Sequence, residues 1–376
     1  MESRELWFAR DEYLDRVSRV QAIMRGHGVD ILLGFHPSSV TWLTGFFSTA
    51  YMLFSVAVVP AEGEPMTVCR DNEEYWFRRT GAFDDHVFWE DGDKPAEIVA
   101  RALAAAGATR ARIGIESAWP FNEKLEAQIR ALVPDAEFVD LGDDVLSRLR
   151  EVKSPAELDT IRKAGRAVVA ATEAGIDAAR AGTSEREVAA VISAALVRAG
   201  SDVAGPGPMG SGERAEHLHA RYEDRLLQTG DTMNLEVDGC VREYYARFFR
   251  TLKIGRATAD ERALATRLLR LQERAWAEVR DGAPVSVPDR IIREGIEAEG
   301  IPRYTNNTFS SIGLTLYPPA RSALVVRGSD WAFEAGMAFH SYVKVGAFMF
   351  SETIAVTRDG HELLTTHPRE LVVTPS

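Results

Sequence analysis

Charged side chains interrupt an apolar and aromatic stretch of the sequence, NLEVDGCVREYYARFFRT, at residues 234–251. The pattern predicts a β-hairpin with its turn at Asp238-Gly239. Glu236 would then lie in the apolar first strand, and Arg247 and Arg250 in the aromatic second strand. An unpaired carboxylate is costly to bury. We therefore expect these charges either to pair with one another or to bind a charged ligand.

The residue types in and near this hairpin suit acid–base chemistry on a charged small molecule. Glu236 could pair with a cation, act as a general base towards water, or attack an electrophilic carbon. His219, in the charged loop HLHARYEDRLLQTGD, could deliver a proton to a departing nitrogen. Arg247, Arg250 and Arg321 are candidates for binding a substrate carboxylate, because guanidinium binds carboxylate through two parallel hydrogen bonds. The alternatives are a structural ion pair across the hairpin and a surface histidine in the loop.

Five further residues could line the same pocket. Tyr244, Tyr317 and Tyr342 could donate hydroxyl hydrogen bonds, although aromatic residues at strand spacing are equally typical of a core. His340 and Glu352 lie in predicted strands with alternating apolar neighbours. Because side chains alternate between the two faces of a sheet, the strand register decides whether either residue enters the pocket.

The composition predicts a globular, two-domain protein of 376 residues, of which 45% are hydrophobic. A net charge of -12 argues against a nucleic-acid partner. The sequence has no apolar segment typical of a signal peptide or a membrane span, so we expect no membrane partner and a cytoplasmic location. Cys69 and Cys240 lie too far apart to indicate a disulfide framework or a cysteine metal site.

Helix and strand patterns alternate through residues 1–150, which predicts an α/β unit. We expect a helix over about residues 11–28 and two more in KPAEIVARALAAAG and FNEKLEAQIRALVP. The expected strands lie in VDILLGF, VTWLTGFF, MLFSVAVVP, PMTVC, ARIGIE and AEFVDLG.

The pattern changes at Ser154 and Pro155, which favour the start of a long helix that reaches about residue 180. A second helix, in GTSEREVAAVISAALVRAG, precedes a glycine-rich loop, AGPGPMGSGER, which we expect to be a flexible flap. We expect another helix over about residues 259–280. The segment that follows it, GAPVSVPDRIIREGIEAEG, has the same pattern as the second helix. This echo suggests that residues 151–376 form two similar halves.

Several motifs, in this order and spacing, resemble the pita-bread family of creatinases, prolidases and methionine aminopeptidases. They are KSPAELDTIRKAG, Gly230-Asp231, Arg250-Thr251, SIGL at 311–314, AGMAF at 335–339 and SETIAVTRDG at 351–360, together with VTWLTGFF in the first segment. The resemblance implies an α/β (α+β) fold with a creatinase-like N-terminal domain at 1–150. It also implies a pita-bread catalytic domain at 151–376, with a curved antiparallel sheet and duplicated halves, and a homodimer.

Metallopeptidases of this family bind two metal ions through two Asp, one His and two Glu. At these positions the resemblance places Glu236, Arg247, Ser310, Tyr342 and Ser351. A cation would repel the metal ions, and hydroxyl groups are poor substitutes for anionic ligands. We therefore expect no catalytic metal and no other cofactor.

The phrases SIGLTLYPP, FHSY, SETIAVT and LTTHPREL resemble the ectoine hydrolase branch of the family. The resemblance implies a metal-independent hydrolase that cleaves a C–N bond of a small, zwitterionic cyclic amidine or guanidino acid. Glu236 would bind or attack the cationic carbon, and His219, at the family's substrate-contacting histidine, would move the proton. The alternatives are a lyase or cyclase in biosynthesis, an inactive binding protein and, least favoured, a Xaa-Pro dipeptidase.

Overall fold

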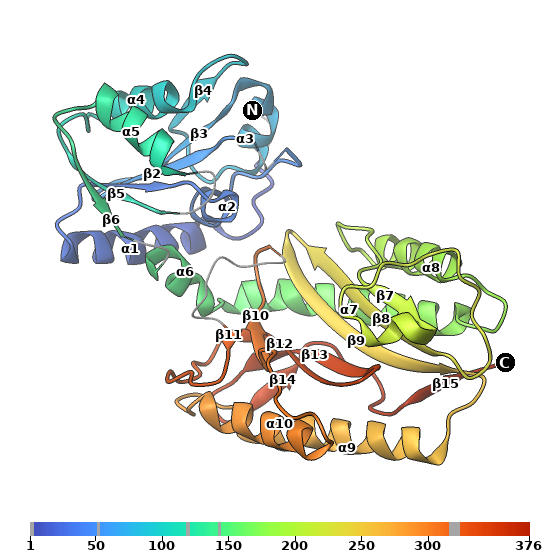
Figure 1. Ribbon diagram of the computed structural model, residues 1–376. Coiled ribbons are helices and arrows are strands. Elements are labelled where there is room, and N and C mark those ends of the chain that lie inside the picture. Colours follow the sequence, from blue (N-terminus) through green and yellow to red (C-terminus); the bar gives the residue numbers. More distant parts are fainter. Residues whose placement is uncertain (1–3, 51–52, 118–120, 142–143, 316–323) are drawn as a thin grey trace. The chain divides into compact units, whose positions relative to one another are not determined.

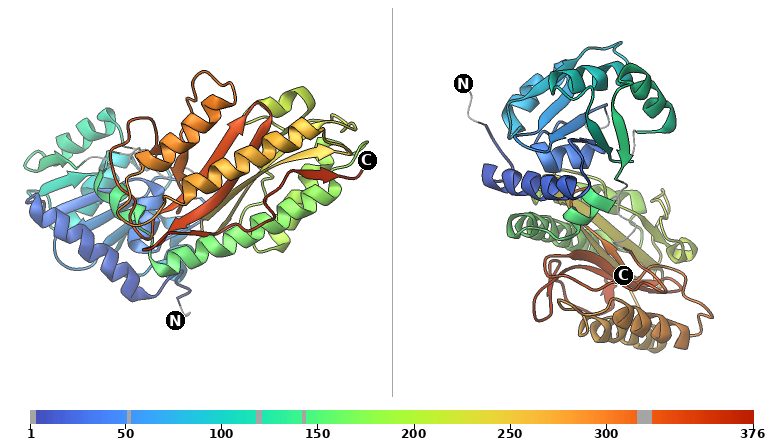
Figure 2. Two further views of the ribbon diagram at one scale, coloured as in Figure 1. Left: turned by 90° about the horizontal axis from the view of Figure 1, so that it is seen from below. Right: turned by 90° about the vertical axis from the view of Figure 1, so that its left-hand side faces the viewer.

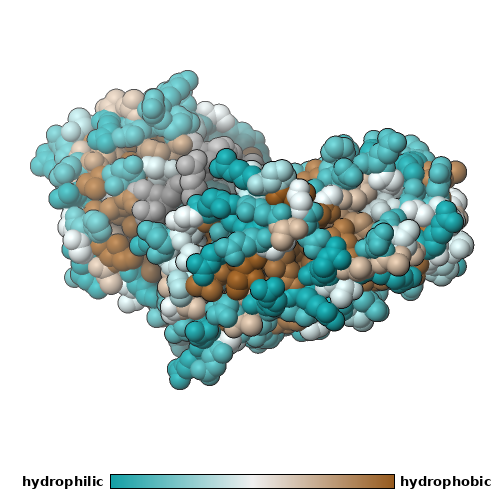
Figure 3. Space-filling view, turned by 60° about the horizontal axis from the view of Figure 1, so that its bottom comes forward, coloured by the Kyte–Doolittle hydropathy of each residue, from teal (hydrophilic) through white to brown (hydrophobic). Residues whose placement is uncertain are grey.

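The computed structural model describes residues 4–50, 53–117, 121–141, 144–315 and 324–376. The chain divides into two compact units, residues 1–150 and 151–376 (Figure 1). None of the helices in these described ranges is long and apolar enough to cross a membrane. On the face drawn in Figure 3, hydrophilic residues predominate and hydrophobic residues gather in smaller patches.

The first unit is a six-stranded mixed sheet with helices, in the strand order β4-β3-β2-β1-β5-β6. Its strands are β1 (Ile31–Gly34), β2 (Val56–Pro60), β3 (Met66–Arg70), β4 (His86–Trp89), β5 (Arg112–Ile115) and β6 (Glu137–Asp140). Its helices are α1 (Arg10–Gly26), α2 (Pro37–Thr44), α3 (Glu74–Thr80), α4 (Pro95–Ala105), α5 (Glu123–Leu132) and α6 (Asp144–Glu151). The α/β class expected from the alternating pattern is confirmed.

One expected strand of this unit is wrong, because VTWLTGFF contributes instead to helix α2. The His36 side chain accepts a hydrogen bond from the backbone N–H of Ser38, and Pro37 occupies the first helical turn. Gly45 ends the helix with a φ of 75°, the left-handed conformation common at helix C-termini. These start and stop signals override the β-branched composition of the segment.

The second unit contains a nine-stranded sheet whose main path is β11-β10-β12-β13-β9-β8-β7, with β14 beside β13 and β15 beside β9 (Figure 2). Its strands are β7 (Met209–Ser211), β8 (Thr232–Val241), β9 (Tyr244–Ile254), β10 (Phe309–Ser311), β11 (Leu324–Val325), β12 (Ala338–Val345), β13 (Phe348–Val356), β14 (His361–Leu363) and β15 (Val372–Thr374). Its α-helices are α7 (Pro155–Ala178), α8 (Glu185–Arg198), α9 (Ala259–Trp276) and α10 (Ser286–Ala298). The two helix pairs match the expected duplicated halves.

The α-helices of this unit pack on one face of the sheet. In α9, Gln272 donates a 2.9 Å hydrogen bond to the backbone oxygen of Ser341, and Trp276 donates one of 2.9 Å to the Ser341 hydroxyl. Side chains on either side of Ser341 in β12 therefore point to the opposite face. We call this opposite face the site face. It carries Asn234, Glu236 and Asp238 from β8, Arg247 and Phe249 from β9, His340 and Tyr342 from β12, and Met349 and Ser351 from β13.

The hairpin that joins β8 to β9 turns four residues later than expected. Arg242 and Glu243 form the turn, with φ values of 51° and 60°, whereas Asp238 and Gly239 lie within β8. A Cβ atom on Gly239 would come within 2.7 Å of Val168, so this glycine serves close packing against α7. Moving the turn brings Asp238 directly opposite Arg247 in the ladder.

Candidate active site

The centre of the site face is an ion-pair cluster in which one guanidinium binds two carboxylates. The Arg247 Nη2 atom donates a 2.6 Å hydrogen bond to Glu236 Oε1, and its Nε atom donates one of 2.9 Å to Asp238 Oδ1. The strand register explains the arrangement, because Asp238 lies opposite Arg247 and Glu236 is two residues away on the same face. The sequence left open whether Glu236 and Arg247 pair with each other or bind a charged ligand. The structure shows them paired with each other.

Burial makes both carboxylates of this cluster hard to ionise. The pKa of Glu236 rises to about 7, chiefly because the group is desolvated and also because Asp238 is close, while Arg247 opposes the rise. Burial also raises the pKa of Asp238, against the opposing charges of Arg247 and His219. A carboxyl group that titrates near neutrality can act as a base or as an acid under ordinary conditions.

Polar groups from β12 and β13 extend the cluster across the site face. His340 Nε2 lies 2.6 Å from the hydroxyl oxygen of Ser351, and the His340 ring stacks on Tyr342 with 5.5 Å between ring centroids. Burial and the charge of Glu236 raise the pKa of Tyr342 to about 12, which places its hydroxyl near the carboxylate. The sequence-predicted residues Glu236, Arg247, His340 and Tyr342 are therefore brought together.

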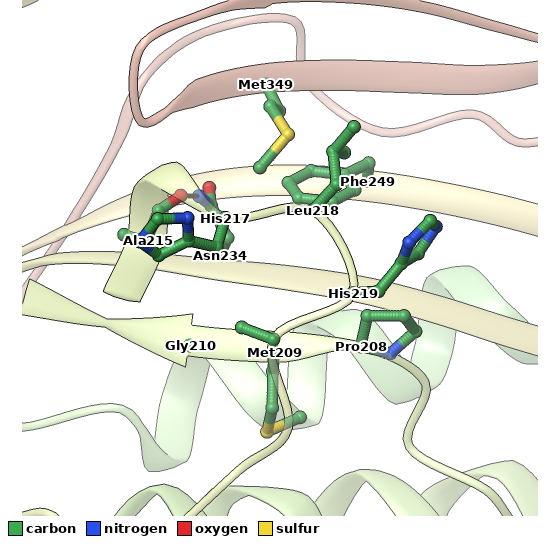
Figure 4. Close-up of a pocket in the computed structure, with 11 residues that line it drawn as sticks. Pro208, Met209, Gly210, Ala215, His217, Leu218, His219, Asn234, Phe249 and Met349 are labelled. Carbon is green, nitrogen blue, oxygen red and sulfur yellow. Dashed lines mark hydrogen bonds between the residues drawn. The ribbon is translucent and has the colours of Figure 1, made fainter. Parts of the chain in front are cut away.

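His219 lies on the rim of a hollow beside this cluster (Figure 4). The hollow is small and partly open to solvent. In Figure 4 the rings of His217 and His219 lie at opposite ends of it, with Leu218 and Phe249 between them. His219 adopts a left-handed backbone conformation with a φ of 63°, and its charge acts on Asp238. The loop thus brings an exposed imidazole close to the buried Asp238.

A buried glutamate at the start of α8 anchors the loop that carries His219. Glu185 accepts hydrogen bonds from the backbone N–H and the hydroxyl of Ser211, at 2.9 and 2.5 Å, and from the backbone N–H of Glu223 at 2.8 Å. It also forms an ion pair with Arg214. One carboxylate thereby ties together both ends of residues 211–223. Together with β7, these contacts give an ordered structure to much of the segment expected to be a flexible flap.

Three residues predicted to bind substrate do not reach the site face. Arg250 and Glu352 form a fully buried ion pair of 2.6 Å on the helix-covered face, where Arg369 also contacts Glu352. Tyr244 donates a 2.6 Å hydrogen bond to Glu157 of α7. We therefore correct their role from substrate binding to stabilisation of the fold. Two other candidates, Tyr317 and Arg321, lie outside the described residues.

Asp238 and Ser351 are among the polar residues of the site face that the sequence-based prediction missed. Asp238 was assigned to a turn because Asp-Gly is a strong hairpin signal, but the alternation from Glu236 along one strand would have indicated the same face. Ser351 was considered only as a replaced metal ligand. Its hydrogen bond to His340 depends on the pairing of β12 with β13, which carries no local signal in the sequence.

Comparison with known families identifies both units. Residues 16–152 match the creatinase/prolidase N-terminal domain, and residues 159–358 match metallopeptidase family M24. The second match spans more than half of the chain. The chain belongs to metallopeptidase family M24. The expected pita-bread architecture is thereby confirmed.

Relatives of this M24 protein include both peptidases and a non-peptide hydrolase. A probable dipeptidase PepE of Mycobacterium tuberculosis is 27% identical, over 98% of each chain. The ectoine hydrolase of Halomonas elongata is 24% identical, over 97% of this chain and 98% of the relative. The crystal structure of dipeptidase PepE from Mycobacterium ulcerans superposes with a TM-score of 0.84 and 26% identity, over 100% of both chains. The family is therefore one of hydrolases and peptidases.

The residues of this M24 protein do not fit the two-metal centre that the family name implies. Arg247 lies between Glu236 and Asp238, where its positive charge would repel a divalent ion. The other ligand positions inferred from the resemblance hold the hydroxyl groups of Ser310, Tyr342 and Ser351. Among the described residues, no group of three His, Cys, Asp or Glu side chains is placed to hold a metal ion. The donor set thus disagrees with the family's usual chemistry.

Proposed function

We propose that this protein is a metal-independent hydrolase that cleaves a C–N bond of a small cyclic amidine or guanidino acid. The observation that carries the proposal is the Arg247 guanidinium bound by Glu236 and Asp238 at the centre of the site face. It supplies a fixed cation where the family's metal ligands would converge. The relationship to an ectoine hydrolase supports a non-peptide substrate.

The charge of the cluster favours a cationic ligand. With both carboxyl groups ionised, two negative charges face the one positive charge of Arg247, so a bound amidinium would be attracted. A cation next to Glu236 would also favour its ionised form and lower its raised pKa. Substrate binding would in this way convert a partly protonated acid into a carboxylate that holds or activates the reacting carbon.

His219 is the proton carrier in this proposal. When the C–N bond breaks, the electron pair stays on the nitrogen, which then needs a proton, and an imidazole near neutrality can deliver it. Arg247 was expected to hold the substrate's acid group, but it already binds two protein carboxylates. Arg247 would therefore have to bind that acid group in addition to these partners or in exchange for one of them.

A second candidate is hydrolysis of a dipeptide, including a Xaa-Pro dipeptide. It is supported by the dipeptidase relatives, which are as extensive in coverage as the ectoine hydrolase. A peptide bond is also a C–N bond, so the two candidates differ in substrate and not in reaction class. A peptidase would have to work with the donor set described above, which lacks the usual anionic ligands.

The experiment is a comparison of substrates on metal-depleted protein. Ectoine, creatine and a Xaa-Pro dipeptide are incubated separately with the protein, and the products are quantified by mass spectrometry. We expect turnover of ectoine or creatine, and loss of that turnover in Glu236→Gln. Glu299→Gln, which changes a carboxylate paired with Arg267 far from the site face, serves as the matched control. Turnover of the dipeptide alone, and only with added Mn²⁺, would overturn the proposal.

A further inference from the structure

A serine and a histidine on the site face form a pair that the proposed function does not use. His340 Nε2 and Ser351 Oγ are 2.6 Å apart, which is hydrogen-bonding distance for a hydroxyl group. Both side chains are buried, with 4% and 0% of their surface exposed. They come from adjacent antiparallel strands, so the ladder between β12 and β13 fixes their separation. A hydroxyl held on an imidazole nitrogen in this way is the arrangement of an activated nucleophile.

The surroundings of His340 keep its ring neutral. Burial, followed by the charge of Arg247, lowers the pKa of His340 well below its ordinary value. The Tyr342 ring, stacked at an interplanar angle of 23°, restricts the imidazole orientation. In the tautomer that carries its proton on Nδ1, a neutral ring accepts a hydrogen bond at Nε2, and Ser351 then donates. His340 is therefore unprotonated at neutral pH, as a general base must be before it acts, while the same burial makes it a weaker proton acceptor. The 2.6 Å contact with Ser351 is what assigns it the role.

We propose that Ser351 is a catalytic nucleophile and that His340 is its general base. The inference rests on the proposed function for its substrate class, and deepens it by naming the group that attacks. Glu236 then has the role of holding the cationic group of the substrate. The position of Ser351 supports this division, because Ser351 lies opposite Phe249, and Phe249 lies opposite Glu236, in consecutive strands. Phe249 lies between the two, so a substrate reaches the carboxylate and the hydroxyl together only when the Phe249 ring moves aside.

The chemical steps balance without any additional reagent. Ser351 Oγ forms a bond to the amidine or guanidino carbon while its proton passes to His340 Nε2. The C–N bond then breaks, and the departing nitrogen keeps the electron pair and takes a proton from His219. The proton on His340 returns to His219 by way of solvent, so both rings regain their starting states. In the second half of the reaction, water attacks the carbon bound to Ser351, its proton passes to His340, and Ser351 Oγ leaves with a proton. The net change is the addition of one water molecule.

The hollow beside His219 approaches Ser351 but does not reach it. Phe249 and Met349 both line that hollow, Phe249 lies opposite Ser351, and Met349 is two residues from it on the same face. In Figure 4 these two side chains lie at the upper end of the hollow. Movement of the Phe249 ring would connect the hollow with the Ser351 hydroxyl. A smaller residue at position 249 should therefore expose Ser351.

The first test uses turnover of the substrate identified in the comparison above. Ser351→Ala should lower kcat at least ~1,000-fold with an almost unchanged melting temperature, because removal of an attacking group abolishes the covalent step. Ser351→Cys should retain measurable turnover, since a thiol can also attack. Ser310→Ala is the matched control, because Ser310 lies opposite His340 on β10 but forms no part of the pair. A Ser351→Ala protein with more than roughly one-tenth of the normal kcat would overturn the inference.

The second test needs no substrate and separates this inference from the proposed function. Phenylmethylsulfonyl fluoride transfers its sulfonyl group to an activated serine with loss of fluoride, and peptide mass spectrometry locates the adduct. We expect an adduct on Ser351 that forms more slowly in His340→Gln and faster in Phe249→Ala. The inference that His340 activates Ser351 would be overturned if the unmutated protein did not react at Ser351. It would also be overturned if His340→Gln left the rate of adduct formation unchanged. Labelling without turnover of ectoine, creatine or the dipeptide would instead contradict only the proposed function.

Discussion

Replacing Glu236 with glutamine should make the protein more stable at high pH and leave its stability almost unchanged at low pH. The reason is that the pKa of Glu236 is raised by burial from 4.5 to about 7. The folded protein thus binds this proton more tightly than the unfolded chain. The stability that the group contributes is fully present below about pH 4.5 and is lost as the pH rises through about 7. Glutamine resembles the protonated acid at every pH.

The size of the effect follows from the same two pKa values. The interval from 4.5 to about 7 corresponds to about 3 kcal/mol of unfolding free energy. At pH 8, Glu236→Gln should approach this gain, which for a unit of this size raises the melting temperature by roughly 6–12 °C. At pH 5 the two proteins should melt within a few degrees of each other. The raised stability would accompany lost activity, a common trade-off at functional sites.

The assay is thermal unfolding of both proteins at several pH values between 5 and 8. Glu299→Gln provides a control of opposite sign, because hydrogen bonding to Arg267 lowers the pKa of Glu299. Glu299→Gln removes the charge that pairs with Arg267. It should lower the unfolding free energy by less than about 1 kcal/mol, mainly at the higher pH values, because the pair is partly exposed. If Glu236→Gln is less stable than the unmutated protein at pH 8 and equal to it at pH 5, the ionised Glu236–Arg247 pair is net stabilising. Such a result would show that burial does not raise the pKa of Glu236 above its value in the unfolded chain.

Three further outcomes test other parts of the account. Glu352→Gln should lower the unfolding free energy by about 3–5 kcal/mol in denaturation experiments, because it leaves Arg250 buried without its carboxylate; a small change would reopen a role for Glu352 in binding. His219→Gln should lower kcat roughly 100-fold at an unchanged melting temperature; an unaltered kcat would exclude His219 from the proton transfer. Dialysis against EDTA should leave kcat unchanged, whereas a loss that Mn²⁺ restores would show that a metal takes part.

The sequence was sufficient to predict the architecture of the second unit, but not to predict which face of the sheet each strand side chain occupies. Capping signals such as Ser154-Pro155 and the amphipathic patterns predicted the α-helices of the second unit to within a few residues. The strands that carry His340 and Glu352 were also predicted, yet the two residues lie on opposite faces, since Ser341, not His340, pairs with Glu352. Both strands are buried on both sides, so alternation of polar and apolar residues could not reveal which side faces the site.

The hairpin shows why a local turn signal can fail. Asp-Gly favours a two-residue turn, whereas Arg242 and Glu243 must adopt left-handed conformations that are unfavourable for side chains with a Cβ atom. Tertiary contacts outweigh this cost. Gly239 packs against α7, and Asp202 binds the backbone N–H of Arg242. Only the complete fold reveals these contacts, and they are what place Asp238 beside Arg247.

The position of Arg247 bears on the proposed metal-independent reaction. Buried carboxylates need a cation, and the guanidinium of Arg247 supplies one through two directional hydrogen bonds to Glu236 and Asp238. Unlike a metal ion, a guanidinium cannot lower the pKa of a bound water by direct coordination. Activation of a nucleophile then has to come from elsewhere on the same face. In the proposed mechanism the His340–Ser351 pair, 2.6 Å apart on that face, provides it.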